Sequence, residues 1–250
     1  MKFIYSNNQV YSTRFFLYNY NGNNFRIVKI KSCKNSGFEE IKKKNTFIDV
    51  NSEEIKRQSL SRTKRNIREL ALCNNFEYFA TFTVNSEKCD RYTLNNVQDK
   101  IKKILHKIKR KNKDFAFLII TEKHKDGAFH FHGLIKSIDD LYINENGYYC
   151  SKIFSDELGF NSFSKIKDYT KCCNYITKYI TKDCIKNSHN QIYISSRGLK
   201  KAVKEEFTNI DFIPSYTNEY VSIKDFTIDN LTNDEKIYFL SLKEGKNKFI

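Results

Sequence analysis

Two apolar segments joined by a short polar linker constrain the fold of this chain more than any other feature. Residues 115–122 (FAFLIITE) and 128–135 (AFHFHGLI) each have the length and the apolar content of a strand. The linker at 123–127, KHKDG, ends in Asp-Gly, a pair that favours the tight turn of a β-hairpin. The sequence therefore predicts an antiparallel hairpin over residues 115–135.

The second strand of this hairpin carries two histidines, His130 and His132. Side chains alternate along a strand, so both imidazoles point to one face, and Phe131 points to the other face, into the core. A turn centred in the linker places Glu122 directly opposite His130 on the same face. Two imidazoles and a carboxylate with open positions suit Mn²⁺ or Mg²⁺. His124 is a competing ligand or a loop residue, and the sequence shows no fourth ligand for a closed zinc site.

A repeated pattern, YITKYITK, occupies residues 175–182 within a helix predicted over 169–182. On a helix, Tyr175 and Tyr179 lie one turn apart on one face, and Lys178 and Lys182 form a stripe beside them. One interpretation is an ordinary amphipathic helix whose tyrosines are half-buried packing residues. The other is chemical, because a tyrosine hydroxyl can attack phosphorus beside a metal ion and a lysine.

The remaining pattern predicts a strand over 78–85, an amphipathic helix over 96–111, a strand over 192–195 and a short helix over 200–208. In the strand over 78–85, Thr81 and Thr83 share one face. Another helix is expected over 53–74, with an apolar side and a strongly basic remainder. The basic residues form either a solvated face or a phosphate-binding face. Those we expect to bind DNA are Arg57, Arg62, Lys64, Arg65 and Arg68.

These elements indicate an α+β fold with a central antiparallel β-sheet and helices packed on it. Residues 1–52 are rich in Asn, Lys and Tyr and are expected to form short strands or a loose arm. Residues 53–210 form the main domain of this prediction. Residues 211–250 form a C-terminal extension that we expect to be partly disordered.

The charge of the chain points to a polyanionic partner. Lys and Arg number 44 and Asp and Glu number 29, which gives a net charge of +15. Nucleic acid is the commonest partner of such a chain, although a solvated lysine-rich surface has the same composition. The glycines form neither GxxxxGK[ST] nor GxGxxG, which disfavours an ATPase or a dinucleotide enzyme.

The cysteines and the apolar segments indicate where the chain is located. The seven cysteines are an odd number and form no CxxC, which favours neither a disulfide framework nor a cysteine-type zinc site. The first residues are too polar for a signal peptide, and no run of 18 apolar residues exists. We therefore expect a cytoplasmic protein with no membrane partner.

Residues from about 57 to 200 resemble the HUH endonuclease superfamily, specifically the rolling-circle replication initiators (Rep proteins) of small phages and plasmids. Three motifs occur in the order of that family. FATFTVN at 79–85 resembles the first, Glu122 with HFHG at 130–133 the second, and YITKYITK at 175–182 the third. SSRGL at 195–199, which contains Arg197, resembles a stretch that follows the third motif in filamentous-phage and microvirus initiators.

The resemblance implies a ferredoxin- or RRM-like nuclease fold and a mechanism. A tyrosine attacks one phosphodiester of single-stranded or origin DNA, forming a 5′-phosphotyrosyl bond and freeing a 3′-OH primer. Tyr179 is the first candidate for this nucleophile and Tyr175 the second, and Lys178 and Lys182 are phosphate or positioning groups. A metal ion, Mn²⁺ or Mg²⁺, is held by Glu122, His130 and His132, and Arg197 joins the DNA-binding residues.

The family also implies partners and alternatives. A host helicase and polymerase are expected, because no helicase is visible in the chain, and the oligomeric state is open. One alternative is an HUH transposase-like strand transferase with the same chemistry. Another is a non-catalytic nucleic-acid-binding module on the same fold, in which the aromatic residues stack on bases or pack in the core.

Overall fold

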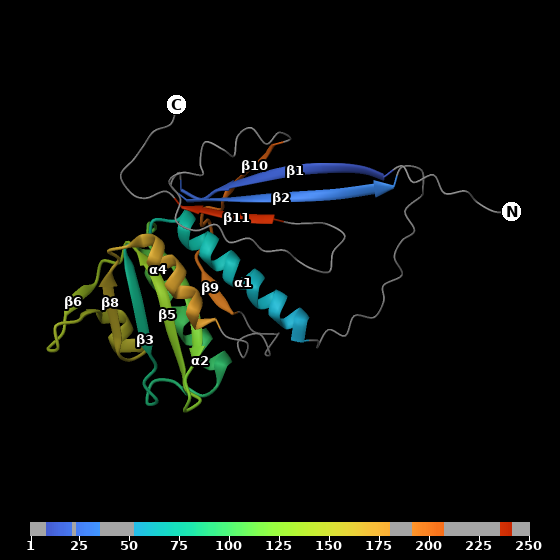
Figure 1. The fold of residues 1–250 in the computed structure, drawn as a ribbon. Coiled ribbons are helices and arrows are strands. Elements are labelled where there is room, and N and C mark those ends of the chain that lie inside the picture. Colours follow the sequence, from blue (N-terminus) through green and yellow to red (C-terminus); the bar gives the residue numbers. More distant parts are fainter. Residues whose placement is uncertain (1–8, 22–23, 36–52, 181–191, 208–235, 242–250) are drawn as a thin grey trace. The chain divides into compact units, whose positions relative to one another are not determined.

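The computed structural model describes residues 9–21, 24–35, 53–180, 192–207 and 236–241 of the chain. It divides the chain into two compact units, residues 50–200 and residues 1–49 with 201–250. Each unit contains its own antiparallel sheet (Figure 1). Among the described residues, no helix has the length and apolar character needed to cross a membrane.

The 50–200 unit is an α+β fold, as predicted, with an antiparallel sheet of seven strands in the order β6-β7-β8-β3-β5-β4-β9. The strands are β3 (Tyr78–Thr83), β4 (Ala116–Lys123), β5 (Phe129–Lys136), β6 (Leu141–Ile143), β7 (Tyr149–Ser151), β8 (Asn161–Lys165) and β9 (Tyr193–Ser195). The helices are α1 (Glu53–Cys73), α2 (Leu94–Lys111), α3 (Lys152–Glu157) and α4 (Tyr169–Tyr175), and a 3₁₀ turn, η1 (Ile176–Tyr179), follows α4.

The predicted hairpin is confirmed as β4 and β5, and its register places Glu122 opposite His130. In the turn, the His124 amide donates to the Ala128 carbonyl at 2.8 Å, and the Gly127 amide donates to the His124 carbonyl at 3.0 Å. Gly127 has a φ of +91°, a conformation in which glycine is favoured. The Asp-Gly pair therefore fixes the register on which the site depends.

The sheet has two different faces because its strands alternate. On one face, Phe82 of β3 and Phe131 of β5 are fully buried and pack with the apolar stripe of α2. That stripe consists of Val97, Ile101, Ile104, Leu105 and Ile108. The opposite face carries Thr81, Thr83, His130 and His132, because these residues alternate with the core residues. The hydrophobic core thus fixes which side chains reach the polar face.

The end of α1 and the start of α4 are held together by one buried tyrosine. The Tyr169 hydroxyl bonds to the carbonyls of Ala71 and Asn74 and accepts from the Phe76 amide at 3.1 Å. Burial raises the pKa of Tyr169, so the hydroxyl stays protonated and able to donate. α4 begins at Asp168, whose side chain accepts from the Lys171 amide at 2.9 Å as an N-cap.

The helix predicted over 169–182 is shorter than expected. α4 ends at Tyr175, η1 ends at Tyr179, and Ile180 has extended backbone angles. A 3₁₀ turn is tighter than an α-helix and commonly ends one. Residues 181–191, which include Lys182, lie outside the described residues.

The other unit is a four-stranded antiparallel sheet in the order β10-β1-β2-β11. Its strands are β1 (Gln9–Asn19), β2 (Asn24–Asn35), β10 (Val203–Phe207) and β11 (Lys236–Ser241). β1 and β2, of 11 and 12 residues, are longer than the short strands we expected.

The helix predicted over 200–208 is wrong, because β10 occupies most of that segment. β10 pairs with β1, from Asn19 opposite Val203 to Phe15 opposite Phe207. The two strands lie near opposite ends of the sequence. Local periodicity carries no information about so distant a partner, and strand formation depends on that partner.

Gly159 provides a test of the close packing beside the polar face. Its φ is +145°, and a Cβ built there would lie 2.5 Å from the Thr83 carbonyl oxygen and 2.7 Å from the Asn85 amide nitrogen. Backbone atoms of a sheet cannot move aside cheaply. Gly147 also has a positive φ, +79°, but its Cβ would have no neighbour within 4 Å.

We therefore expect Gly159→Ala to lower the free energy of unfolding by on the order of 2–3 kcal/mol, and Gly147→Ala by about 1 kcal/mol. Urea unfolding of the full chain, followed by far-UV circular dichroism, measures both. Equal losses would show that the contact with β3 does not constrain residue 159.

Candidate functional site

The polar face of the sheet carries two cross-strand rows of functional side chains. In the first row, Glu122 of β4 is paired with His130 of β5, which is paired with Thr83 of β3. In the second row, His132 of β5 is paired with Thr81 of β3. All five residues were placed on one face by strand alternation, and the structure confirms that placement.

Each histidine is held by a threonine through its Nδ1 atom. The Thr81 Oγ1 lies 3.3 Å from His132 Nδ1, and the Thr83 Oγ1 lies 3.2 Å from His130 Nδ1. A hydroxyl can donate or accept, so each threonine can serve either tautomer of its histidine. These contacts leave Nε2 of each imidazole as the atom available to a ligand. The sequence placed both threonines on this face, but their pairing with the histidines was not predicted.

Glu122 is bonded to His132 as well as paired with His130 in the ladder. Its Oε2 accepts from His132 Nε2 at 2.8 Å, and it lies 3.7 Å from His124 Nε2. Burial is the main cause that lowers the pKa of His132, against a hydrogen bond and the charge of Glu122, which raise it. The neutral imidazole, which is the ligand form, is therefore favoured.

His130 and His124 lie against each other. Their rings are stacked with centroids 3.6 Å apart and planes 9° apart. Burial, then the neighbouring His124 and His132, lowers the pKa of His130, because a second positive charge close by is unfavourable. Sequence reasoning left His124 open as a competing ligand or a loop residue, and the structure brings it to the edge of the site.

The donor set fits a divalent metal ion in its chemistry. His132 Nε2 and Glu122 Oε2 are 2.8 Å apart, close to the separation of about 3 Å between neighbouring ligands of an octahedral ion with bonds of about 2.1 Å. Metal-bound histidines usually bond through their second nitrogen to a fixed partner, and both threonines occupy that position. Among the described residues, however, no three His, Cys, Asp or Glu side chains converge on a single point.

The two tyrosines of the third motif pack directly on this set. The Tyr179 ring is stacked on the His132 ring, with centroids 3.6 Å apart and planes 16° apart. Phe79 lies behind both, 6.0 Å from His132 and 5.7 Å from Tyr175 between ring centroids. The sequence predicted that Tyr175 and Tyr179 would be neighbours, but it did not show that Tyr179 covers a ligand histidine.

The hydroxyl groups of the tyrosines are also joined. Tyr179 Oη donates to Tyr175 Oη at 2.9 Å. Burial, followed by this hydrogen bond, raises the pKa of Tyr179 above its ordinary range, so its hydroxyl is neutral at physiological pH. Tyr175 is the more accessible of the two, with 44% of its surface exposed, and Lys178 Nζ lies 5.0 Å from its ring centroid.

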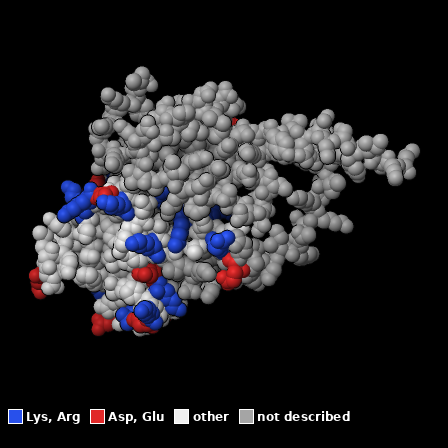
Figure 2. All heavy atoms as spheres, in the orientation of Figure 1, with Lys and Arg blue, Asp and Glu red and all other residues white. Residues whose placement is uncertain are grey.

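The basic residues of α1 lie on a helix that packs against α4 and η1. Arg57 and Arg62 are exposed, whereas Lys64, Arg65 and Arg68 are partly buried. Arg68 Nε donates to Asn174 Oδ1 at 2.5 Å, so this arginine ties α1 to the helix that carries the tyrosines. Figure 2 shows more Lys and Arg than Asp and Glu side chains on the visible face of the described residues. Arg197 follows β9 and is not part of this helix surface.

A group of exposed aromatic side chains was not found from the sequence. Phe160, Tyr148 and Tyr142 have 50%, 53% and 42% of their surface exposed, and the rings of Tyr148 and Phe160 meet edge to face at 6.2 Å. Phe160 precedes β8, and its carbonyl accepts from the Thr83 amide at 2.8 Å. It therefore extends the row of Glu122, His130 and Thr83. A periodic signal for this aromatic platform, defined as Tyr142, Tyr148 and Phe160, is missing because its members come from three short segments.

Comparison with known proteins identifies one family. Residues 77–184 match the family model described as Replication-associated protein ORF2, which also takes in the phage gene-2 replication protein. The match runs from β3 to the end of the third motif and confirms the resemblance to replication initiators. Neither the curated proteins nor the solved structures contain a match to this chain. α1 and β9 lie outside the matched residues.

The lowered histidine pKa values predict how stability depends on pH. Both pKa values are lowered in the folded chain, so the unfolded chain binds these protons at higher pH. The stability present above the unfolded pKa of about 6.5 is then lost as the pH falls. We expect the free energy of unfolding to fall between about pH 7.5 and 5.5, and to fall less steeply in the double variant His130→Gln with His132→Gln.

Urea unfolding at several pH values measures this slope. The variant His106→Gln is the control, since His106 is an exposed histidine of α2. Identical slopes in the wild type and in the double variant would contradict the assignment of the pH dependence to the site.

Proposed function

We propose that this chain initiates rolling-circle replication by nicking and joining single-stranded DNA, since its residues 77–184 are similar to the Replication-associated protein ORF2 family. The observation that carries the proposal is the stack of Tyr179 on His132, which is itself bonded to Glu122. An ordinary packing tyrosine has no need of a histidine–carboxylate pair beside its ring. Here a candidate nucleophile and a candidate metal-ligand set lie together on one face of the sheet.

Tyr179 is the proposed nucleophile. Its Oη attacks the phosphorus of one phosphodiester, a P–O bond to tyrosine forms, and the P–O3′ bond breaks. The products are a 5′-phosphotyrosyl linkage and a 3′-oxygen that takes up a proton and serves as a primer. Because the pKa of Tyr179 is raised, its hydroxyl proton has to be removed during attack, and the first acceptor beside it is the Tyr175 oxygen.

Glu122, His130 and His132 would hold the divalent ion, Mn²⁺ or Mg²⁺. When bound, such an ion polarises the scissile phosphate and stabilises the charge that develops on it. Thr81 and Thr83 fix the two imidazole rings through Nδ1 and keep Nε2 free for ligation. Lys178, beside the Tyr175 ring, adds positive charge near the same phosphate, and Lys182 is proposed for the same role from the motif alone.

Tyr175 is the proposed second nucleophile. It is more exposed than Tyr179, and the two hydroxyl oxygens are 2.9 Å apart. After Tyr179 has formed its linkage, Tyr175 can attack a second phosphodiester from the same side of the sheet. One chain can then perform both transfers that release a single-stranded circle. A host helicase and polymerase would open and copy the duplex.

The aromatic platform is the proposed binding surface for the bases of the nicked strand. Phe160 lies in line with Thr83 and His130, and the Tyr148 ring meets its ring edge to face. Stacking of bases on aromatic rings binds single-stranded DNA with little sequence preference. Bases beside the scissile phosphate would therefore stack on Phe160.

The first test of the proposal is the covalent adduct. The protein is incubated with Mn²⁺ or Mg²⁺ and single-stranded fragments of its own replicon, and adducts are separated on a denaturing gel. We expect a metal-dependent band in the wild type and its loss in Tyr179→Phe, because phenylalanine keeps the stack on His132 but has no hydroxyl. Tyr169→Phe is not a suitable control, since its hydroxyl holds α1, so Tyr149→Phe serves instead.

The Tyr175→Phe variant should still form the first adduct but fail to complete strand joining. A band that persists in Tyr179→Phe and vanishes in Tyr175→Phe would exchange the two roles. Binding of DNA without any adduct, under all metals, would replace the enzyme by the non-catalytic binding module. An adduct that transfers its strand to a duplex target would favour the transposase-like alternative.

The second test concerns the platform. Phe160→Ala should weaken binding of a single-stranded oligonucleotide on the order of tenfold, because loss of one base–aromatic stack costs about 1–3 kcal/mol. Tyr149→Ala is the matched control. Its ring is 51% exposed, but its register partner is Phe163 of the core face. Fluorescence anisotropy measures both, and equal weakening would show that the platform has no special role.

A further inference from the structure

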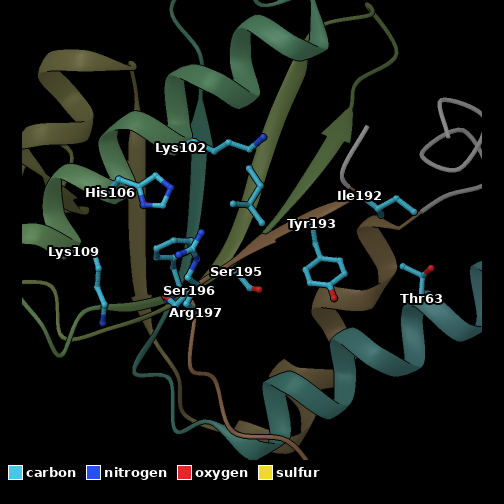
Figure 3. A pocket seen from close by; sticks show the side chains of 11 residues that line it. Thr63, Lys102, His106, Lys109, Ile192, Tyr193, Ser195, Ser196 and Arg197 are labelled. Carbon is cyan, nitrogen blue, oxygen red and sulfur yellow. The ribbon is translucent and has the colours of Figure 1, made fainter. Parts of the chain in front are cut away.

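A hollow of about 1040 Å³ lies at the β9 edge of the seven-stranded sheet. α2 forms one wall with Lys102, His106 and Lys109, and the chain from Ile192 to Arg197 forms another. Thr63 of α1 closes the end of the hollow (Figure 3). All of these residues belong to the 50–200 unit. We call this hollow the edge pocket.

The described lining of the edge pocket is basic. It includes two lysines, one arginine and one histidine, and no Asp or Glu is among the described lining residues. Lys102 has one acidic neighbour on its own helix, Asp99, at 4.0 Å. Lys109 Nζ donates to the carbonyls of Lys113 and Phe115, so it closes the end of α2 while it adds charge to the wall.

Arg197 is held in place by the residues on either side of it. Ser196 is buried, its amide donates to the Phe117 carbonyl at 3.0 Å, and its Oγ accepts from the Phe117 amide at 2.9 Å. Gly198 has a φ of +80°, which turns the chain immediately after the arginine. The SSRGL segment therefore docks on the start of β4 and presents Arg197 at the pocket. Figure 3 shows Arg197 among the lining side chains, with the basic residues of the α2 wall beside it.

The positive charge continues along α2 beyond the pocket. A shallower depression next to it is lined by Lys103, His106, Lys109, Arg110 and Lys113. Lys103 and Arg110 are exposed, and His106 is shared by the two hollows. The sequence predicted only that α2 packs on the sheet. Its outer surface is a strip of cations leading into the edge pocket, and we call it the α2 strip.

We propose that the edge pocket and the α2 strip bind the phosphate backbone of double-stranded DNA beside the nicking site. Surfaces that bind single strands combine cations with exposed aromatic rings, whereas cations alone contact phosphates and read no bases. In the pocket, Phe117 is buried and Tyr193 is partly buried, so neither ring is an open stacking surface. The aromatic platform has the opposite character.

The two surfaces can be occupied together. α2 packs on the sheet face that carries Phe82 and Phe131, and Tyr179 packs on the face that carries His132. A duplex held at α2 and the pocket leaves the face of the tyrosines open to a single strand. The inference rests on the proposed function only for the identity of the polyanion as DNA.

The test measures binding of a duplex of about 20 base pairs without a nicking site, by fluorescence anisotropy at several salt concentrations. Lys102→Ala and Arg197→Ala should each weaken binding severalfold, and the double variant should reduce the slope of log affinity against log salt by about two, since each phosphate contact contributes about 0.9. The matched control is Lys165→Ala with Lys167→Ala, which removes two exposed lysines elsewhere in the same unit.

Adduct formation on a short single-stranded oligonucleotide is measured in parallel. We expect Lys102→Ala to leave it unchanged while duplex binding falls. Equal duplex binding in the double variant and in the control would overturn the inference. Loss of oligonucleotide nicking in Lys102→Ala, in a chain that still unfolds at the wild-type urea concentration, would overturn it too. If the wild type forms no adduct, the proposed function fails, and the duplex measurement still decides whether the edge pocket binds DNA.

Discussion

The pairing register of β4 with β5 is the constraint on which the site depends. Glu122 stands opposite His130 because the turn at residues 124–127 sets that register. A slip of one residue would turn Phe131 out of the core and send both histidines into it, because side chains alternate with a period of two. The fully buried Phe131 therefore stabilises the position of the two imidazoles next to it. The geometry of the polar face follows from the packing of the apolar face.

Much of this arrangement could be predicted from local sequence. The hairpin, the face shared by Glu122, His130 and His132, and the neighbouring tyrosines each depend on alternation, a tight turn or helical spacing. Such short-range rules act within a few residues and are visible in a single chain. The same rules failed for residues 200–208, where a strand forms because β1 offers its edge, and a partner so distant in sequence leaves no local pattern.

Contacts between segments could not be predicted. Thr83 was placed on the correct face, yet its contact with His130 needs the order of β3 and β5 in the sheet. Phe160 is isolated in the sequence and becomes part of the polar row only because β8 pairs with β3. The stack of Tyr179 on His132 depends on how η1 ends α4 and how Tyr169 anchors that helix. These features come from tertiary pairing, which a pattern in one segment does not encode.

The raised pKa of Tyr179 is consistent with a nucleophile that is held inactive before its substrate arrives. A neutral hydroxyl bonded to Tyr175 does not attack phosphorus, and the ring rests on His132, whose Nε2 is bonded to Glu122. A cation at the Glu122–His132 pair would replace that hydrogen bond and favour the tyrosinate through its positive charge, because an opposite charge nearby lowers the pKa of an acid. The contacts that keep the tyrosine protonated are thus the same contacts that ligand binding would change, which couples activation of the nucleophile to assembly of the site.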